Sequence, residues 1–312
     1  MTKTVGIFTE GGVGIGLGHL TRCRALAYTL QQRGCNPVFF IFSDHDVAGV
    51  VQPFSVQNIG WKADVGSIIK KDQLSFAIVD SYLASRDVYD VISSILDGKM
   101  LIIDDCMRLT YPKSFVVNPS IYGESLGYPI GDGLRYLLGK DYIILRPDFW
   151  EVGPKKIKDT IENIFLTLGG SADKKILEQI ALFIQGHSDA HVRILDSYQK
   201  KYSAVQMREM MSVSDLCISG GGQTMYELAR LGVPTISVTL DDNHMLNVKA
   251  LQKAGFSFSA GKIDEDLFFA RLRDGLDYMS DPIVRKKCSD AGQKAVDGKG
   301  VRRLADIIIG AI

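Results

Sequence analysis

The chain has 312 residues, of which 46% are hydrophobic and 23% are charged, and its 36 Lys and Arg residues balance its 36 Asp and Glu residues. This length favours two domains, because a single hydrophobic core rarely serves more than about 250–300 residues. Zero net charge argues against a broad basic surface for nucleic acid or for an anionic membrane. We therefore expect an ordinary globular protein with small-molecule chemistry.

Targeting and redox features are also absent from the sequence. No apolar stretch approaches the roughly 18 residues of a membrane span, and the first residues lack the longer apolar run of a signal peptide. Five scattered cysteines without a C-x-x-C pair indicate a reduced chain that has neither a disulfide framework nor a structural zinc site. The sequence predicts a cytoplasmic protein and gives no oligomeric state.

Short apolar runs alternate with longer amphipathic stretches along the chain. Almost unbroken hydrophobicity is typical of strands buried on both faces of a parallel sheet. We expect such strands at Thr4–Thr9, Pro37–Phe42, Phe76–Asp80, Met100–Asp104, Ser114–Asn118, Ile164–Leu168, His191–Asp196, Asp215–Ser219 and Pro234–Leu240. Helices are expected at Gly18–Arg33, Ala172–Gln185, Thr224–Leu231, Met245–Ala254, Asp264–Met279 and Val301–Gly310. This alternation predicts two doubly wound, Rossmann-like α/β domains, 1–150 and 151–312, that face a cleft.

A glycine-rich loop follows the first predicted strand. It includes Gly16 and Gly18 and leads into a helix that has His19 in its first turn. The loop matches neither G-x-G-x-x-G nor a Walker A motif, but its backbone could approach a phosphate or a sugar closely. The positive end of the helix disfavours a protonated imidazole, so His19 is a candidate general base. The alternative is a histidine that only caps the helix and orders the loop.

Three further loops follow strands of the second half. Gly169 and Gly170 belong to a turn that either only connects a strand to a helix or binds a phosphate. The triplet Gly220, Gly221 and Gly222 precedes a helix that carries Thr224 and Glu227, a geometry that suits a diphosphate at the helix N-terminus and a ribose on the carboxylate. Glu227 could instead only complement the helix dipole. Asn243 and His244 follow the next strand and either meet the ligand or cap a helix. The pair Asp104-Asp105 suggests a metal site only weakly, since no third ligand has a recognisable spacing.

Several of these segments together resemble one family. Gly16-Leu-Gly-His19-Leu-Thr-Arg22 resembles the G-x-G-H-x-x-R signature of the UDP-sugar hydrolases of the pseudaminic acid pathway and of their spore-coat polysaccharide relatives. Asp80-Ser-Tyr82 is similar to the family's Asp-x-Tyr strand end. Matching segments also occur at Leu138–Phe149, at Leu168–Asp173 and at Ser214–Glu227, which is followed by Leu231–Pro234. Where the family usually has Asn-Gln, this chain has Asn243-His244, which leaves the identity of the sugar open.

The resemblance implies a GT-B fold, shared with the peptidoglycan N-acetylglucosaminyl transferase, and metal-free, cofactor-free cleavage of a UDP-sugar. His19 would activate water for attack at the anomeric carbon, and Tyr82 would help to define the sugar pocket. Arg22 would be among the residues that bind the substrate. UDP would be held by Gly220–Gly222 and Thr224, with Glu227 on the ribose. The leading hypothesis is a hydrolase of a UDP-linked amino or deoxy sugar. A glycosyltransferase that uses a hydroxyl acceptor is the alternative, and a non-catalytic nucleotide-sugar binding protein is a third.

Overall fold

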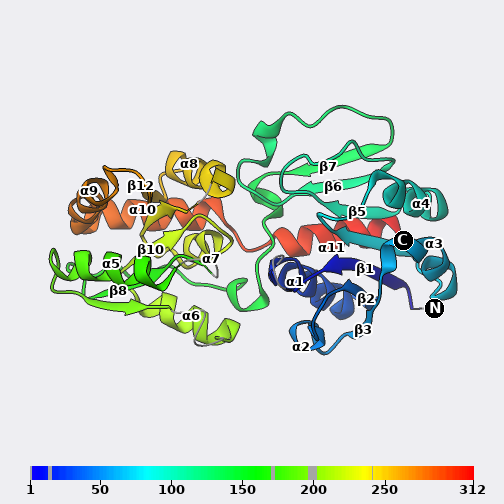
Figure 1. The fold of residues 1–312 in the computed structure, drawn as a ribbon, viewed down its shortest axis with the longest axis horizontal. Coiled ribbons are helices and arrows are strands. Elements are labelled where there is room, and N and C mark those ends of the chain that lie inside the picture. Colours follow the sequence, from blue (N-terminus) through cyan, green and yellow to red (C-terminus); the bar gives the residue numbers. More distant parts are fainter. Residues whose placement is uncertain (1, 13–15, 170–172, 196–201, 241) are drawn as a thin grey trace. The chain divides into compact units, whose positions relative to one another are not determined.

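Parallel β-sheets organise the chain, which a computed structural model describes at residues 2–12, 16–169, 173–195, 202–240 and 242–312. The chain forms two compact units. The first unit comprises Met1–Arg146 and Lys299–Ile312, and the second comprises Pro147–Gly298. One seven-stranded sheet and one five-stranded sheet are formed, in which every paired strand runs parallel to its neighbour (Figure 1). The predicted pair of doubly wound α/β domains is confirmed.

The first unit has strand order β3-β2-β1-β4-β5-β6-β7. The chain moves outward from β1 to β3 and then returns to pair β4 with the other side of β1, so the topological switch point lies between β1 and β4. Its elements are β1 (Thr4–Glu10), α1 (Gly18–Gln32), β2 (Asn36–Phe42), α2 (Ala48–Val51), β3 (Ser55–Asn58), α3 (Trp61–Lys71), β4 (Phe76–Asp80), α4 (Arg86–Leu96), β5 (Met100–Ile103), β6 (Ser114–Asn118), η1 (Gly123–Leu126), β7 (Leu134–Leu138), η2 (Lys140–Tyr142) and α11 (Gly300–Ala311).

Helices cover both faces of the first sheet. On one face, α3 and α4 share a core with the strands, where Phe8 stacks on Phe40 with ring centroids 4.9 Å apart and Trp61 donates a hydrogen bond to the carbonyl of Thr9 at 3.0 Å. On the other face, α1 packs against α11. Because both faces are covered, the central strands are almost wholly apolar, and only their ends carry polar side chains.

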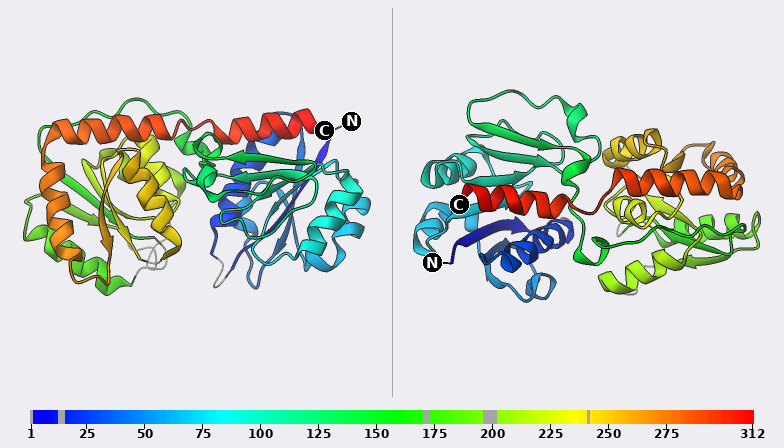
Figure 2. Two further views of the ribbon diagram at one scale, coloured as in Figure 1. Left: turned by 90° about the horizontal axis from the view of Figure 1, so that it is seen from above. Right: turned by 180° about the vertical axis from the view of Figure 1, so that it is seen from behind.

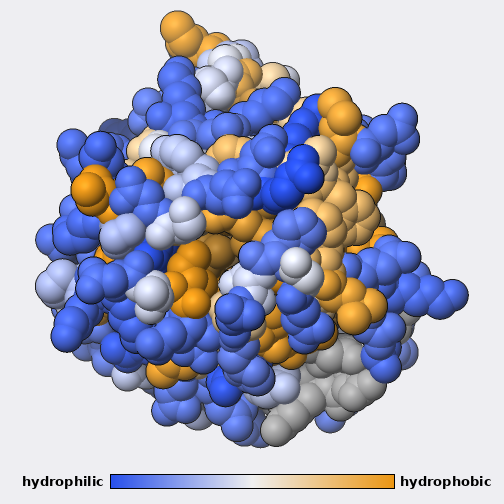
Figure 3. Space-filling model, turned by 90° about the vertical axis from the view of Figure 1, so that its left-hand side faces the viewer, coloured by the Kyte–Doolittle hydropathy of each residue, from blue (hydrophilic) through white to orange (hydrophobic). Residues whose placement is uncertain are grey.

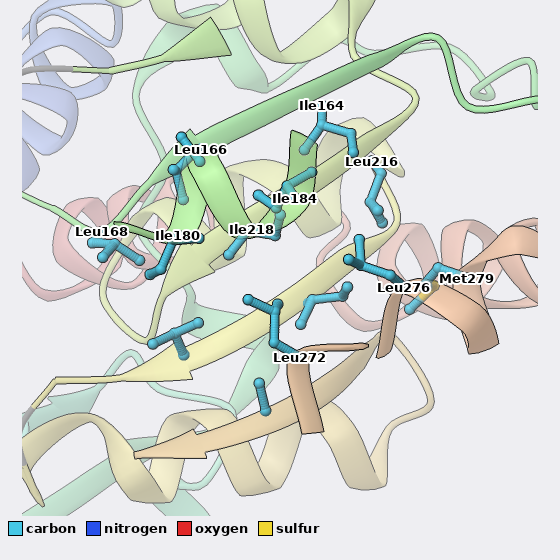
Figure 4. Packing of buried hydrophobic residues seen from close by; sticks show 14 of the residues in the cluster. Ile164, Leu166, Leu168, Ile180, Ile184, Leu216, Ile218, Leu272, Leu276 and Met279 are labelled. Atoms are coloured by element: carbon cyan, nitrogen blue, oxygen red, sulfur yellow. The ribbon is translucent and has the colours of Figure 1, made fainter. Parts of the chain in front are cut away.

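The second unit has strand order β12-β11-β10-β8-β9, with its switch point between β8 and β10. Its core lies between the strands and the helices α5 and α9, and Figure 4 shows Ile164, Leu166, Ile218 and Leu272 converging there. The elements are η3 (Pro147–Phe149), β8 (Asn163–Thr167), α5 (Lys174–Gln185), β9 (His191–Ile194), α6 (Ala204–Val213), β10 (Leu216–Gly220), α7 (Thr224–Leu231), β11 (Thr235–Thr239), η4 (Asp242–His244), α8 (Met245–Lys253), β12 (Ser257–Lys262), α9 (Phe268–Ser280) and α10 (Pro282–Ala295).

The C-terminal helix belongs to the first unit, whereas the sequence assigned all of 151–312 to the second domain (Figure 2). The reason is burial: Val301, Leu304 and Ile308 form an apolar stripe on α11 that packs against α1. Gly300 lies so close to the backbone of Ile143 that a side chain there would collide with it. The chain therefore passes from the first unit to the second at Arg146–Pro147, a few residues before the expected boundary at 150, and returns at Gly298–Lys299.

The outer surface of the second unit is that of an ordinary globular domain. Figure 3 shows one end of it, where hydrophilic side chains predominate and apolar ones gather around a shallow hollow. Across the described ranges of the chain, no helix has both the length and the apolar composition needed to cross a membrane.

Candidate active site

The glycine loop of the first unit lies at the carboxyl end of β1, beside the switch point. A short antiparallel bridge joins Gly12 and Gly16, whose backbone N–H donates to the carbonyl of Gly12 at 2.9 Å. Gly16 has φ of +82°, a left-handed conformation that only glycine adopts without strain. Helix α1 begins two residues later at Gly18. The loop thus brings the positive N-terminus of α1 to the edge of the sheet where ligands bind in open α/β folds.

His19 forms a buried pair with Asp80, the last residue of β4. Its Nδ1 lies 2.6 Å from Asp80 Oδ1, and the two side chains are 6% and 0% exposed. An ionised carboxylate accepts hydrogen bonds only, so it holds the proton of a neutral imidazole on Nδ1 and leaves Nε2 with its lone pair. Within the described part of the chain, the hydrogen bonds of the ring are made through Nδ1. This tautomer is the one a general base requires.

Arg22, one turn further along α1, neutralises Asp80. Its Nε and Nη2 atoms donate to the two oxygens of Asp80, each at 2.6 Å. Burial by itself would raise the pKa of Asp80, but the charges of Arg22 and His19 and their hydrogen bonds hold that pKa well below its usual range. Asp80 is therefore ionised at neutral pH. The sequence predicted that Arg22 binds the substrate, and in the structure its three guanidinium nitrogen atoms donate hydrogen bonds to side chains of the protein.

A second carboxylate, Asp105, holds the other end of the guanidinium. Nη1 of Arg22 donates to its two oxygens at 2.9 and 2.8 Å, and the hydroxyl of Tyr82 donates to Oδ2 at 2.8 Å. The Tyr82 ring meets His19 edge to face, with centroids 4.6 Å apart. Burial and then the charge of Asp105 raise the pKa of Tyr82 well above its usual value, so the phenol stays a neutral donor. Tyr82 is 46% exposed, which leaves part of its ring open to a ligand.

Glu10, the last residue of β1, fixes the segment that carries Tyr82. Its fully buried carboxylate accepts hydrogen bonds from the hydroxyl of Ser81 at 2.7 Å and from the backbone N–H groups of Tyr82 and Leu83 at 2.6 and 3.1 Å. These bonds tie the end of β1 to the loop after β4 across the switch point. The orientation of Tyr82 beside His19 follows from them.

Sequence reasoning missed Asp80, Asp105 and Glu10 as parts of this cluster. Each stands at the carboxyl end of a predicted strand or directly beyond it, which is a usable signal, but only the order β1-β4-β5 shows that these three ends are neighbours. The sequence weakly suggested Asp104 and Asp105 as metal ligands, but in the structure both carboxylates have partners within the protein. The carboxylate of Asp104 accepts hydrogen bonds from the backbone N–H groups of Cys106 and Arg108, and that of Asp105 pairs with Arg22.

In the second unit, the triple-glycine loop lies at the carboxyl end of β10, beside the switch point between β8 and β10. A Cβ atom on Gly220 would lie 2.5 Å from the carbonyl oxygen of Leu168, and one on Gly221 would lie 2.7 Å from Cβ of His244. Both positions therefore need glycine for close backbone approach. Asn247 from α8 donates to the carbonyl of Gly221 at 2.6 Å and fixes the loop. Helix α7 then begins at Thr224, so the positive N-terminal end of this helix lies next to the loop.

The structure also places other residues of the second unit that the sequence predicted as ligand contacts. A Cβ built on Gly222 would lie 3.7 Å from Nε2 of His244, so the imidazole borders the glycine triplet. Gly169 follows β8 with φ of +94°. Glu227 lies in the first turn of α7 and is 3% exposed. Asn243 lies in η4, and Gly170 lies outside the described residues.

Comparison with known proteins agrees with this architecture. Residues 155–283 match the glycosyltransferase family 28 C-terminal domain. The chain is 26% identical over 339 aligned positions to the spore coat polysaccharide biosynthesis protein SpsG of Bacillus subtilis, which covers 97% of each protein. It is 23% identical to a Helicobacter pylori protein described as a pseudaminic acid cytidylyltransferase and UDP-2,4-diacetamido-2,4,6-trideoxy-beta-L-altropyranose hydrolase. That match covers 77% of this chain and 45% of the relative, so the chain spans about half of the H. pylori protein.

Solved structures share the fold at low sequence identity. MurG of Acinetobacter baumannii superposes with a TM-score of 0.71 at 14% identity, over 99% of both chains. A structure described as LpCGTa in complex with UDP superposes with a TM-score of 0.67 at 11% identity, over 100% of this chain and 99% of that one. The two-sheet architecture is the GT-B fold of these glycosyltransferases, as the sequence predicted. The domain match and the fold accordingly indicate an enzyme of the glycosyltransferase-like class.

Proposed function

We propose that the protein hydrolyses a UDP-linked amino or deoxy sugar at the anomeric carbon, with His19 as the general base. The observation that carries the proposal is the buried His19–Asp80 pair at 2.6 Å, placed at the carboxyl edge of the first sheet. An ionised, fully buried carboxylate on Nδ1 fixes the tautomer and leaves Nε2 as an acceptor, which a general base requires and a histidine that only orders the loop does not. The relatives with polysaccharide and UDP-sugar descriptions support the substrate class.

The proposed reaction needs one proton transfer and one displacement. Nε2 of His19 takes a proton from water as the water oxygen bonds to the anomeric carbon. The bond from that carbon to the diphosphate oxygen breaks, and UDP leaves with the electron pair. Asp80 stabilises the imidazolium formed on His19, which later releases its proton to solvent. Tyr82, beside the ring, would contact the sugar.

The second unit would bind the nucleotide. Gly220–Gly222 and the N-terminus of α7 offer backbone N–H groups to the diphosphate, and His244 borders the same loop. Thr224, Glu227 and Asn243 are the remaining proposed contacts, with Glu227 assigned to the ribose. UDP is a good leaving group, so oriented donors and a base supply the main requirements of this reaction without a cofactor.

A panel assay tests the proposal. UDP release would be measured from several UDP-sugars, including a 2,4-diacetamido-trideoxy sugar, with no acceptor added. We expect turnover of at least one substrate and a loss of about 10²–10⁴-fold in His19→Ala, with UDP affinity nearly unchanged. His187→Ala is the matched control, because His187 is an exposed histidine on α5's C-terminal side in the second unit. Equal turnover in wild type and His19→Ala would refute the assigned role.

A glycosyltransferase is the second candidate, favoured by the family 28 domain match and by the MurG-like fold. It uses the same nucleotide loop, and a sugar or lipid hydroxyl replaces water as the nucleophile. Saturable UDP binding without acceptor-free release would favour the transferase. Release that appears only when a hydroxyl acceptor is added would establish it.

A further inference from the structure

Arg22 is held by two carboxylates, and only one of them touches His19. Asp80 occupies Nε and Nη2 of the guanidinium, and Asp105 occupies Nη1. Arg22 Nη2 also lies 3.3 Å from His19 Nδ1. The orientation of Asp80 beside the imidazole therefore depends on where Arg22 is held, and Asp105, from the loop after β5, holds its far end. The two side chains of the Arg22–Asp105 pair are 15% and 21% exposed.

Asp105 reaches His19 by a second route. It accepts the hydrogen bond of the Tyr82 hydroxyl, and the Tyr82 ring packs edge to face against the imidazole. Tyr122 adds a further support, because its hydroxyl donates a hydrogen bond to the backbone carbonyl of Asp105 at 3.3 Å. One carboxylate thus fixes both an ionic and an aromatic neighbour of His19 while making no contact with that ring itself among the hydrogen bonds of the described residues.

We propose that Asp105 is a positioning residue, which orients His19 through Arg22 and Tyr82 and sets its proton affinity through the negative charge that it places against Arg22. This inference rests on the proposed function, in which His19 is the base. It predicts that loss of the Asp105 charge changes the pH dependence of the reaction as well as its rate. A residue that only bound the sugar would change substrate affinity instead.

The sign of the pH effect follows from the groups around the imidazole. Helix α1 contributes the cation Arg22 and the thiol of Cys23, whose pKa is raised by burial and by Asp80, so the thiol is neutral. The end of β4 contributes the anion Asp80 and the neutral phenol of Tyr82, and the loop after β5 contributes the anion Asp105.

The end of β1 adds Glu10, whose carboxylate is occupied by backbone N–H groups and the Ser81 hydroxyl. Removing Asp105 leaves Arg22 opposed by one fewer anion. The protonated imidazole is then less stabilised, and His19 loses its proton at a lower pH.

Asp105→Asn is the test, because it removes the charge and keeps the shape. We expect the acid limb of the kcat/KM profile to move to lower pH by about half to one unit, as for one unit charge removed at a few ångströms across a partly buried site. We also expect kcat to fall about tenfold with KM changed less than twofold. Tyr82→Phe removes the hydroxyl without changing any charge, so its acid limb should stay in place.

A second measurement separates this inference from the proposed function. The ring signals of His19 would be titrated by ¹⁵N–¹H NMR in the unliganded full chain, in wild type and in Asp105→Asn. A lower titration midpoint in the variant supports positioning by Asp105, even if His19→Ala proves active and the proposed base is wrong. An unmoved midpoint overturns the inference. A raised KM with an unmoved acid limb would also overturn it and make Asp105 a substrate contact.

Discussion

Replacing Asp80 by Asn should disable His19 while leaving the shape of the cluster almost unchanged. Asp80 accepts hydrogen bonds from Nδ1 of His19 and from Nε and Nη2 of Arg22, all at 2.6 Å, and its side chain is fully buried. An asparagine has one oxygen to offer, so in either flip its amide N–H₂ group faces a donor. If it faces His19, the ring shifts its proton to Nε2 to accept from the amide, and Nε2 is no longer a base.

The magnitude follows from the two roles of the carboxylate. Loss of the reactive tautomer and of imidazolium stabilisation should lower kcat by about 10²–10⁴-fold. Breaking a buried ion pair on one side should lower the free energy of unfolding by about 3 kcal/mol, because Arg22 keeps only Asp105 as a partner. Asp90→Asn is the matched control. Asp90 pairs with Arg86 one turn away on the exposed face of α4, and its loss should cost less than about 0.5 kcal/mol.

The assay combines UDP release with chemical denaturation across pH. The pKa of Asp80 is lowered in the fold, so the stability it contributes is complete above the unfolded value of about 3.9 and is lost as pH falls further. The difference in the free energy of unfolding between wild type and Asp80→Asn should therefore be constant near neutral pH and should become smaller below about pH 4. A variant with wild-type kcat, or a difference in the free energy of unfolding that increases in acid, would refute the reasoning.

Three further predictions concern backbone positions and a helix cap. Gly220→Ala should abolish UDP binding in calorimetry and lower Tm, because its Cβ would lie 2.5 Å from the carbonyl oxygen of Leu168; retained affinity would contradict the close approach. Gly300→Ala should destabilise the first unit by about 1–3 kcal/mol through its collision with the backbone of Ile143, and unchanged denaturation would argue against the docking of α11. Ser203→Ala removes a capping box from α6 and should cost about 1 kcal/mol in urea unfolding, whereas an equal midpoint would show that the cap contributes nothing.

Buried central strands could be predicted from the sequence, and edge strands mostly could not. β1, β4, β8 and β10 are covered on both faces, so their hydrophobicity is continuous and visible in the sequence. The missed strands β3, β7 and β12 stand at sheet edges and carry polar residues, as in Ser55-Val-Gln-Asn58. The domain assignment of α11 was missed for another reason. An amphipathic stripe shows that a helix packs on something, but the partner, here α1 of the first unit, is a tertiary choice.

Some residues of the candidate site could be predicted from a single segment of the sequence, whereas their partners depend on the tertiary fold. Gly16, His19 and the glycine triplet are local signals, because a helix N-terminus behind glycines is visible in one segment. The partner of His19 is 61 residues away, and Asp105 is 83 residues from Arg22. Only the pairing of β4 with β1 and of β5 with β4 brings these carboxylates to one place. The two carboxylate partners of Arg22 could not be predicted from its own segment for this reason.

The two candidate sites differ in charge as the proposed chemistry requires. Among the described residues that are hydrogen-bonded in the cluster around His19, the anions Asp80 and Asp105 outnumber the cation Arg22. The loop at Gly220–Gly222 offers backbone N–H groups and a positive helix end instead. When the bond to UDP breaks, positive charge develops on the sugar and negative charge on the diphosphate. Carboxylates suit the first charge, and N–H donors suit the second. Each site therefore has the charge that the proposed cleavage would require of it, whether water or a hydroxyl acceptor is the nucleophile.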